Sequence, residues 1–238
     1  MSSTNRSSLI NFSGREVRVE IVRSAQARRL ILRADAVKGI VRATTPLRMR
    51  IGDVEKFIAA HHGWIVARVA GWPSPLAFEN GTKLPFDGGT LTLDWSPDHP
   101  RGVRRRGNHL IIGGPAATVP GRTLRWLRAA ALADLTPATL NLAARIGRRA
   151  TRVTVRDPAS RWGSCASSGA IGYSWRLILA PPLVRQSVVA HEVAHLVHSN
   201  HGREFWTLAE SLTDGDLPAA RAWLKTKGAA LHWVGRPA

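Results

Sequence analysis

Three histidines and one glutamate in the last quarter of the chain have the types and spacing of a metal site. His191 and His195 are four residues apart in an apolar stretch that predicts a helix, so their imidazoles share one face. Both can reach one Zn²⁺ at about 2.0–2.1 Å, while Glu192, about 100° around the helix, can reach a water beside the ion. Ser199-Asn200 is a plausible helix end, after which His201 can return as third ligand. The pattern H-E-x-x-H-x5-H predicts one Zn²⁺ per chain with its fourth position open to water.

Two alternatives accompany this prediction. An H-E-x-x-H pattern occurs by chance in many proteins, but two histidines and a carboxylate on an otherwise apolar helix are costly to bury without a metal. His198 lies on the same face as His191, and it could replace His201 if the helix continued. The two residues would then be about 10 Å apart along the axis, which disfavours binding of one ion by both. His198 is therefore expected to line the pocket or to lie on the surface.

The segments before this motif predict the elements that position it. Apolar residues from Leu124 to Ile146 recur at helical spacing and predict a long helix, interrupted or restarted at Pro137 because proline lacks the N–H donor. A strand at 153–155 and a hairpin formed by 161–165 and 171–179 follow, and the metal-binding helix begins near Leu183. Residues 217–231 predict a helix that closes the domain.

The first half of the chain is predicted to be rich in β-structure. Alternation at Val17, Val19 and Ile21, with the later runs at 30–32 and 40–41, predicts an antiparallel meander. Helical spacing over 54–69 predicts one helix, and short apolar runs at 90–95 and 110–112 predict a second set of hairpins. The expected organisation has four parts: a disordered N-terminus (1–13), a β-rich portion with one helix (14–112), a linker (113–121) and a catalytic domain (122–238).

Composition limits the classes of protein to which the chain can belong. Its 238 residues are 44% hydrophobic and 21% charged, which indicates a globular protein. One cysteine, Cys165, excludes an intrachain disulfide. The polar first residues do not have the pattern of a signal peptide, and no apolar run reaches the roughly 20 residues of a membrane span. We therefore expect a cytoplasmic protein that does not bind membranes.

The net charge of +18 favours an anionic partner. Arginines gather in three clusters: Arg23, Arg28, Arg29 and Arg33; Arg104, Arg105 and Arg106; and Arg145, Arg148, Arg149 and Arg152. One reading of these clusters is affinity for nucleic acid, and the other is a solvated surface of an arginine-rich protein. Residues 161–238 carry only eight basic against five acidic residues, so most of the excess charge lies outside the predicted metal site.

The chain resembles the YgjP-like metallopeptidases, relatives of the SprT-type zinc proteases. The resemblance is carried by S-R-W-G-S-C at 160–165, Y-S-W-R-L at 173–177, L-A-P-P at 179–182, the H-E-V-A-H-L motif at 191–196, and Asn200-His201 with Phe205-Trp206. It is specific over about 121–232 and weaker in the front strands. It implies an α+β, zincin-like catalytic domain with a long helix, a small antiparallel sheet, the metal-binding helix and C-terminal helices.

The resemblance also implies roles for individual residues. His191, His195 and His201 would bind zinc, and Glu192 would be the general base when a metal-activated water attacks a peptide bond. Substrate-binding candidates near this site are Trp162, Tyr173, Trp175, Arg176 and His198, although both tryptophans can equally be core residues. The alternative function is a basic, nucleic-acid-associated protein whose metal site is structural or inactive, and the intact Glu192 disfavours it.

Overall fold

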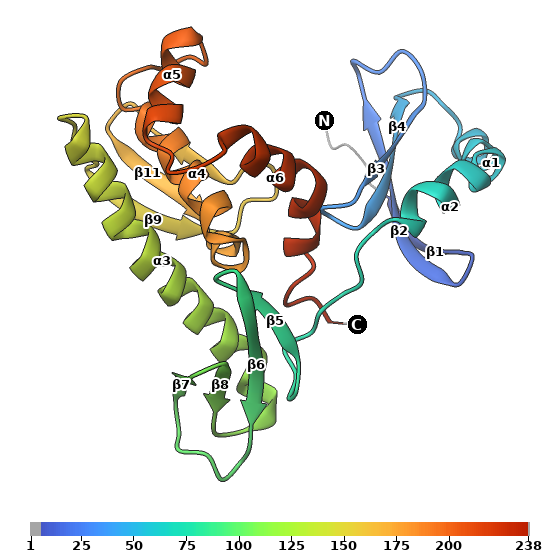
Figure 1. Ribbon diagram of the computed structural model, residues 1–238. Helices are drawn as coiled ribbons and strands as arrows, with labels where there is room; N and C mark the ends of the chain where they lie inside the picture. Colours follow the sequence, from blue (N-terminus) through green and yellow to red (C-terminus); the bar gives the residue numbers. More distant parts are fainter. Residues whose placement is uncertain (1–5, 238) are drawn as a thin grey trace. The chain divides into compact units, whose positions relative to one another are not determined.

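The computed structural model describes residues 6–237, which form two compact units (Figure 1). One unit ends at Ser74 and the other begins at Pro75. Both combine helices with small sheets, so the fold is α+β, as predicted. The division falls well before the predicted linker at 113–121, and those residues lie inside the second unit.

The first unit contains a four-stranded sheet with the strand order β1-β2-β4-β3. Its strands are β1 (Arg6–Phe12), β2 (Arg15–Ser24), β3 (Ile31–Asp35) and β4 (Ile40–Pro46). The strands β2 and β4 are parallel, so the prediction of an antiparallel meander is wrong. Val19 of β2 and Val41 of β4 are buried. These two strands take the central positions of the sheet, so β4 lies between β2 and β3.

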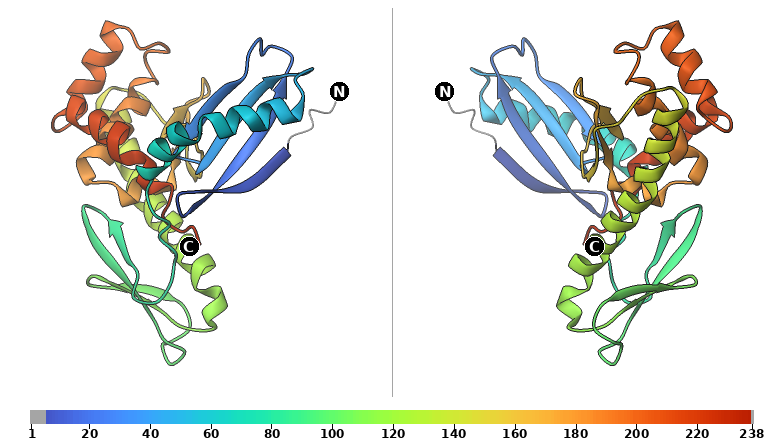
Figure 2. Two further views of the ribbon diagram at one scale, coloured as in Figure 1. Left: turned by 90° about the vertical axis from the view of Figure 1, so that its right-hand side faces the viewer. Right: turned by 90° about the vertical axis from the view of Figure 1, so that its left-hand side faces the viewer.

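Two further predictions for this unit differ from the structure. The sequence predicts disorder over 1–13, but residues 6–12 form β1, and residues 1–5 lie outside the described part of the chain. The single predicted helix is divided into α1 (Ile51–Ala60) and α2 (His62–Ala70). At the division His61 leaves the helical conformation, at φ −101° and ψ 17°, and the weak helix former Gly63 follows two residues later. Figure 2 shows both helices against one face of the sheet.

The second unit opens with another four-stranded sheet, in the equivalent order β5-β6-β8-β7. Its strands are β5 (Lys83–Phe86), β6 (Gly89–Trp95), β7 (Val103–Arg106) and β8 (His109–Ile112). As in the first sheet, the two central strands are parallel and each edge strand is antiparallel to its neighbour. One face, which includes Leu91, Leu93 and Leu110, is fully buried, so the sheet forms one wall of the core.

A long helix, α3 (Val119–Arg145), runs along the second unit (Figure 1). It is preceded by the 3₁₀ turn η1 (Ala116–Thr118), so part of the predicted linker is helical. The predicted interruption at Pro137 is wrong, since the helix continues through it. Pro137 and Ala133 both lie on the exposed face of α3, where water can satisfy the carbonyl that proline leaves without a donor. The opposite face buries residues four apart, Leu127, Ala131 and Leu135.

A three-stranded sheet and three helices complete the unit. The strands β9 (Arg152–Arg156), β10 (Gly163–Cys165) and β11 (Ala170–Ser174) have the order β10-β11-β9. The predicted hairpin of β10 and β11 is present, but β9 and β11 are parallel, so the sheet is mixed and not antiparallel. After β11 come η2 (Trp175–Leu179), α4 (Pro182–Ala194), α5 (Arg203–Ser211) and α6 (Leu217–Leu231). The core of the unit lies between α3, α4 and the sheets.

Among residues 6–237, none of the helices combines the length and the apolar character that crossing a membrane requires.

Candidate metal centre

Helix α4 presents the H-E-x-x-H motif at its C-terminal end. Pro181 and Pro182 set its start, since proline suits the first turn of a helix, and its apolar residues Val184, Val188 and Val189 enter the core. His191 and Glu192 fall in the last turn, and His195 caps the helix. The rings of His191 and His195 have centroids 5.0 Å apart, which follows from their spacing of one helical turn.

The chain reverses direction after α4 and brings His201 back to the helix. His195 to His198 still bond to the last turn of α4, and α5 begins only at Arg203. The Nε2 atoms of His201 and His191 lie 3.2 Å apart, and ligand atoms of His191, His195 and His201 all lie within 4.8 Å of one another. Two nitrogens bound to one tetrahedral Zn²⁺ would be about 3.3 Å apart. The three imidazoles therefore fit a zinc ion.

His198 acts on this cluster through its backbone. Its carbonyl oxygen lies 3.0 Å from Nδ1 of His195, so it can accept that N–H and leave Nε2 of His195 unprotonated toward the cluster. The side chain of His198 turns instead toward Glu204, with Nδ1 3.9 Å from a carboxylate oxygen. The structure therefore places His198 beside the histidine cluster but not within it.

Two aromatic residues of α5 form the base of the cluster. The ring of Phe205 is fully buried, and its centroid lies between 4.5 and 4.9 Å from those of all three histidines. The ring of Trp206 stacks 5.7 Å from that of His201, and the guanidinium of Arg221 lies over the same Trp206 ring at 4.1 Å from its centroid. The sequence analysis used Phe205-Trp206 only as part of a resemblance. Their position four and five residues after His201 is the signal that could have indicated their role.

Glu192 lies beside the histidines, almost enclosed by protein. Its exposed fraction is 5%, and burial raises the pKa of its carboxyl group to about 7, although the positive charge of Arg161 acts in the opposite direction. On the sheet side it meets Gly163 of β10, where a Cβ atom would stand only 2.5 Å from Oε1 of Glu192. This position therefore requires glycine if the carboxylate is to keep its place.

His191 is held in its neutral form. Burial lowers its pKa to about 4, and the nearby charges of His195, His201 and Arg221 act in the same direction. A metal binds the neutral imidazole, so no proton has to be removed from this ligand near neutral pH.

A hollow of about 420 Å³ opens in front of the histidines and Glu192. Its other wall comes from the β10 segment, including Arg161, Ser164 and Cys165. Burial, and then the charge of Glu192, raise the pKa of the Cys165 thiol, so it stays protonated. The hollow leaves room beside the three histidines for water and a further group.

A second hollow of about 320 Å³ also adjoins His191 and Glu192. Trp162, Val188 and Leu224 give it an apolar lining, and Arg161 and Arg221 lie at its polar margin. Trp162 is only partly buried, and its ring is supported by Gly228 of α6. Of the residues that were expected to bind substrate, Trp162 is the one that lines a hollow at the histidine cluster.

Three of the other four sequence-predicted substrate residues, Tyr173, Trp175 and Arg176, do not line these hollows. Tyr173 and Trp175 are 1% and 0% exposed, and the hydroxyl of Tyr173 bonds to Thr139 of α3 at 3.0 Å. Arg176 forms two hydrogen bonds with Asp157, and its Nη1 donates to the carbonyls of Leu231 and Val234. Their burial argues against contact with a substrate: they support the sheet and anchor the C-terminal segment. The alternation of β11 turns Ile171 and Tyr173 to the core, and the η2 turn that follows buries Trp175 and Arg176.

Comparison with known proteins assigns the class of this fold and site. A sequence model of the YgjP-like metallopeptidase domain matches residues 28–227, so the protein is of the metallopeptidase class. The chain belongs to the YgjP-like family, as the resemblance indicated. The match also covers most of the first unit. No curated protein and no solved structure gives a significant match.

Proposed function

We propose that the protein is a zinc-dependent peptidase with a zincin-like catalytic centre. The observation that carries this proposal is the convergence of three histidines and one buried carboxylate on a single hollow. Metallopeptidase-family membership supports peptide substrates and a metal. The order of the long helix, the small sheet and the metal-binding helix supports the zincin-like description.

His191, His195 and His201 would hold the ion through their ring nitrogens. When bound, Zn²⁺ supplies a Lewis acid that polarises the peptide carbonyl and makes a water more acidic. The backbone carbonyl of His198 keeps His195 in the tautomer that leaves Nε2 free for the ion. Phe205 fills the space behind the three rings, which restricts their rotation.

Glu192 would move the proton. Its carboxylate accepts a proton from the attacking water while that oxygen bonds to the peptide carbon, and then delivers the proton to the leaving amine nitrogen as the C–N bond breaks. Gly163 keeps the carboxylate in place, and Arg161 supplies a positive charge beside it. The apolar hollow at Trp162 would receive an apolar side chain of the substrate.

The test has two parts, metal content and cleavage. The purified protein should contain about one equivalent of zinc by mass spectrometry, and His201→Ala should lower this content. Glu192→Gln should keep zinc but reduce cleavage of an unstructured protein by about 10²- to 10⁴-fold. Val197→Ala, at an exposed position on the same helix end, is the control for both measurements.

The opposite results would reject the proposal. Less than about half an equivalent of zinc, unchanged in His201→Ala, would exclude the three-histidine site. Zinc-loaded Glu192→Gln that cleaves as fast as the wild type would exclude the role of Glu192. A zinc-containing wild type without peptidase activity on any unstructured protein would favour the alternative of a structural or inactive site.

A further inference from the structure

The outer face of the sheet β5-β6-β8-β7 carries a row of hydrogen-bond donors far from the histidine cluster in sequence. The strand register places one residue from each strand side by side, in the order Lys83, Thr92, His109 and Arg106. Adjacent strands lie about 4.8 Å apart, so the row spans about 14 Å. The next residue along each of the two central strands, Leu93 and Leu110, is fully buried, which shows that this row lies on the outer face.

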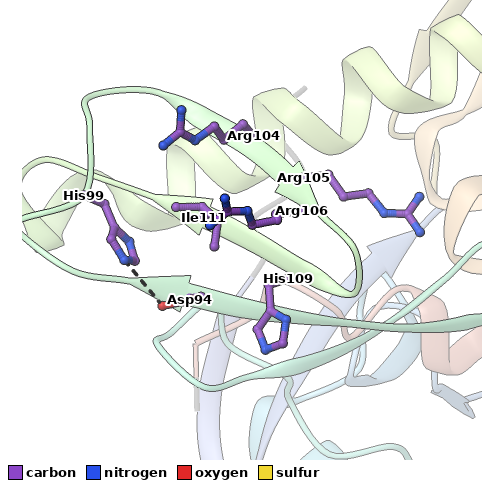
Figure 3. Close-up of a pocket in the computed structure, with 7 residues that line it drawn as sticks. All are labelled: Asp94, His99, Arg104, Arg105, Arg106, His109 and Ile111. Atoms are coloured by element: carbon purple, nitrogen blue, oxygen red, sulfur yellow. Dashed lines mark ion pairs between the residues drawn. The ribbon is translucent and has the colours of Figure 1, made fainter.

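A second row lies two residues along the strands and completes a basic hollow. Its members are Arg104, Ile111 and Asp94. Together with His99 from the β6–β7 connection they line a hollow of about 500 Å³ (Figure 3). Asp94 is the one acidic residue in its lining, and its carboxylate lies 3.9 Å from Nε2 of His99. Positive charge therefore predominates in the hollow.

Arg104 and Arg106 are available to a ligand. Both are exposed, and among residues 6–237 neither side chain forms a hydrogen bond or an ion pair. The residue between them, Arg105, is held by its own hairpin: its Nε donates to the carbonyl of Gly107 at 2.8 Å, and its guanidinium lies 5.0 Å from the ring centroid of Phe86. Arg105 therefore steadies the hairpin that presents the other two arginines.

We propose that this outer face binds the phosphate groups of single-stranded nucleic acid. A guanidinium group offers a planar pair of donors that matches phosphate oxygens, and Lys83, Thr92 and His109 add further donors along the row. The exposed ring of His109 gives a surface on which a base can stack. The proposal concerns a surface of the second unit alone and does not depend on zinc or on peptidase activity.

The size of the face indicates a ligand with repeated anionic groups. One phosphate would contact one or two of the donors, whereas the row extends for about 14 Å and the hollow continues beside it. A phosphodiester backbone places charges along such a row and projects bases from it. Because most contacts would be made to the backbone, we expect binding that is tolerant of sequence and strongly dependent on salt.

The experiment is a binding titration by fluorescence anisotropy. The full-length protein is titrated into a labelled single-stranded oligothymidylate of about 12 nucleotides, at several salt concentrations. The double variant Arg104→Gln/Arg106→Gln should bind at least about tenfold more weakly. The slope of log K against log salt concentration should be smaller in magnitude by about 1.4, because two phosphate contacts are lost. The control Arg148→Gln/Arg149→Gln removes the same charge from exposed positions at the end of α3, and it should change affinity by less than about twofold.

Competitors identify the ligand class. Unlabelled oligothymidylate should displace the probe, while inorganic phosphate and polyglutamate at equal charge concentration should not. Equal loss of affinity in both double variants would overturn the proposal, because binding would then follow net charge and not this face. Effective competition by inorganic phosphate or by polyglutamate would also overturn it. Thermal melting of each variant shows whether a loss of binding comes from unfolding.

Discussion

Gly163 of β10 lies directly against the carboxylate of Glu192 of α4. A Cβ atom at position 163 would stand 2.5 Å from Oε1 and 2.7 Å from Cδ of Glu192, closer than real side chains approach. The edge strand of the small sheet thus sets the position of the proposed general base, although the two residues are 29 positions apart in the chain.

Gly163→Ala should therefore displace the Glu192 carboxylate and leave the histidines in place. A misplacement of about 1 Å at a catalytic group can cost about 10²-fold in rate, so we expect a loss of kcat of this order. Zinc content, measured by mass spectrometry, should remain that of the wild type. Gly121→Ala, whose added Cβ atom would meet nothing closer than 3.8 Å, is the matched control. Normal kcat in Gly163→Ala would show that the carboxylate position is not critical.

Phe205→Ala should weaken both the fold and the histidine cluster. The ring is fully buried against three imidazoles, so its removal leaves a cavity that costs about 3–5 kcal/mol in the free energy of unfolding. Because Phe205 orients the proposed ligands, zinc affinity should fall by about tenfold or more. Chemical denaturation and a competition titration with a zinc-binding dye measure the two effects. Leu140→Ala, at an exposed position of α3, should change neither.

Tyr173→Phe separates a structural from a catalytic role for the single tyrosine of the chain. Its hydroxyl is buried and bonds to Thr139, so the variant should lose about 1 kcal/mol of stability. The rate of peptide cleavage should remain within about twofold of wild type, because the hydroxyl lines neither hollow at the histidine cluster. A large fall in kcat with unchanged stability would show that the hydroxyl of Tyr173 acts in catalysis.

Asp157→Asn should destabilise the second unit in a pH-dependent way. Burial raises the pKa of Asp157, but the hydrogen bonds and charge of Arg176 outweigh this and hold it below its ordinary value of 3.8. The ion pair therefore contributes its full stability above the unfolded-state pKa and loses it as the pH falls through the lower folded-state pKa.

We expect Asp157→Asn to cost about 2 kcal/mol at neutral pH. The difference from wild type should be constant above about pH 5 and shrink as the pH is lowered from about 5 toward about 2. Urea denaturation at each pH measures this difference, and Asp98→Asn, at an exposed position, serves as the control. A difference that stays constant over this range would show that the Arg176 pair does not depend on the charge of Asp157.

The sequence by itself determined the local parts of this protein. Helical periodicity placed His191 and His195 on one face, and it predicted the helix over 217–231, because these patterns depend on residues only a few positions apart. The three-histidine grouping is also local, since a segment of eleven residues, 191–201, includes all three histidines. Family motifs in the same segments led to the YgjP-like assignment.

The tertiary structure decided the relationships between distant segments. Parallel pairing of β2 with β4 and of β9 with β11 depends on which strands become central, and alternation within a strand does not encode this. The burial of Tyr173, Trp175 and Arg176 follows from the packing of β11 and η2 on α3, which sequence proximity to the motif does not encode. The approach of Gly163 to Glu192 and the donor row over four strands likewise exist only after folding, because they join residues from separate elements.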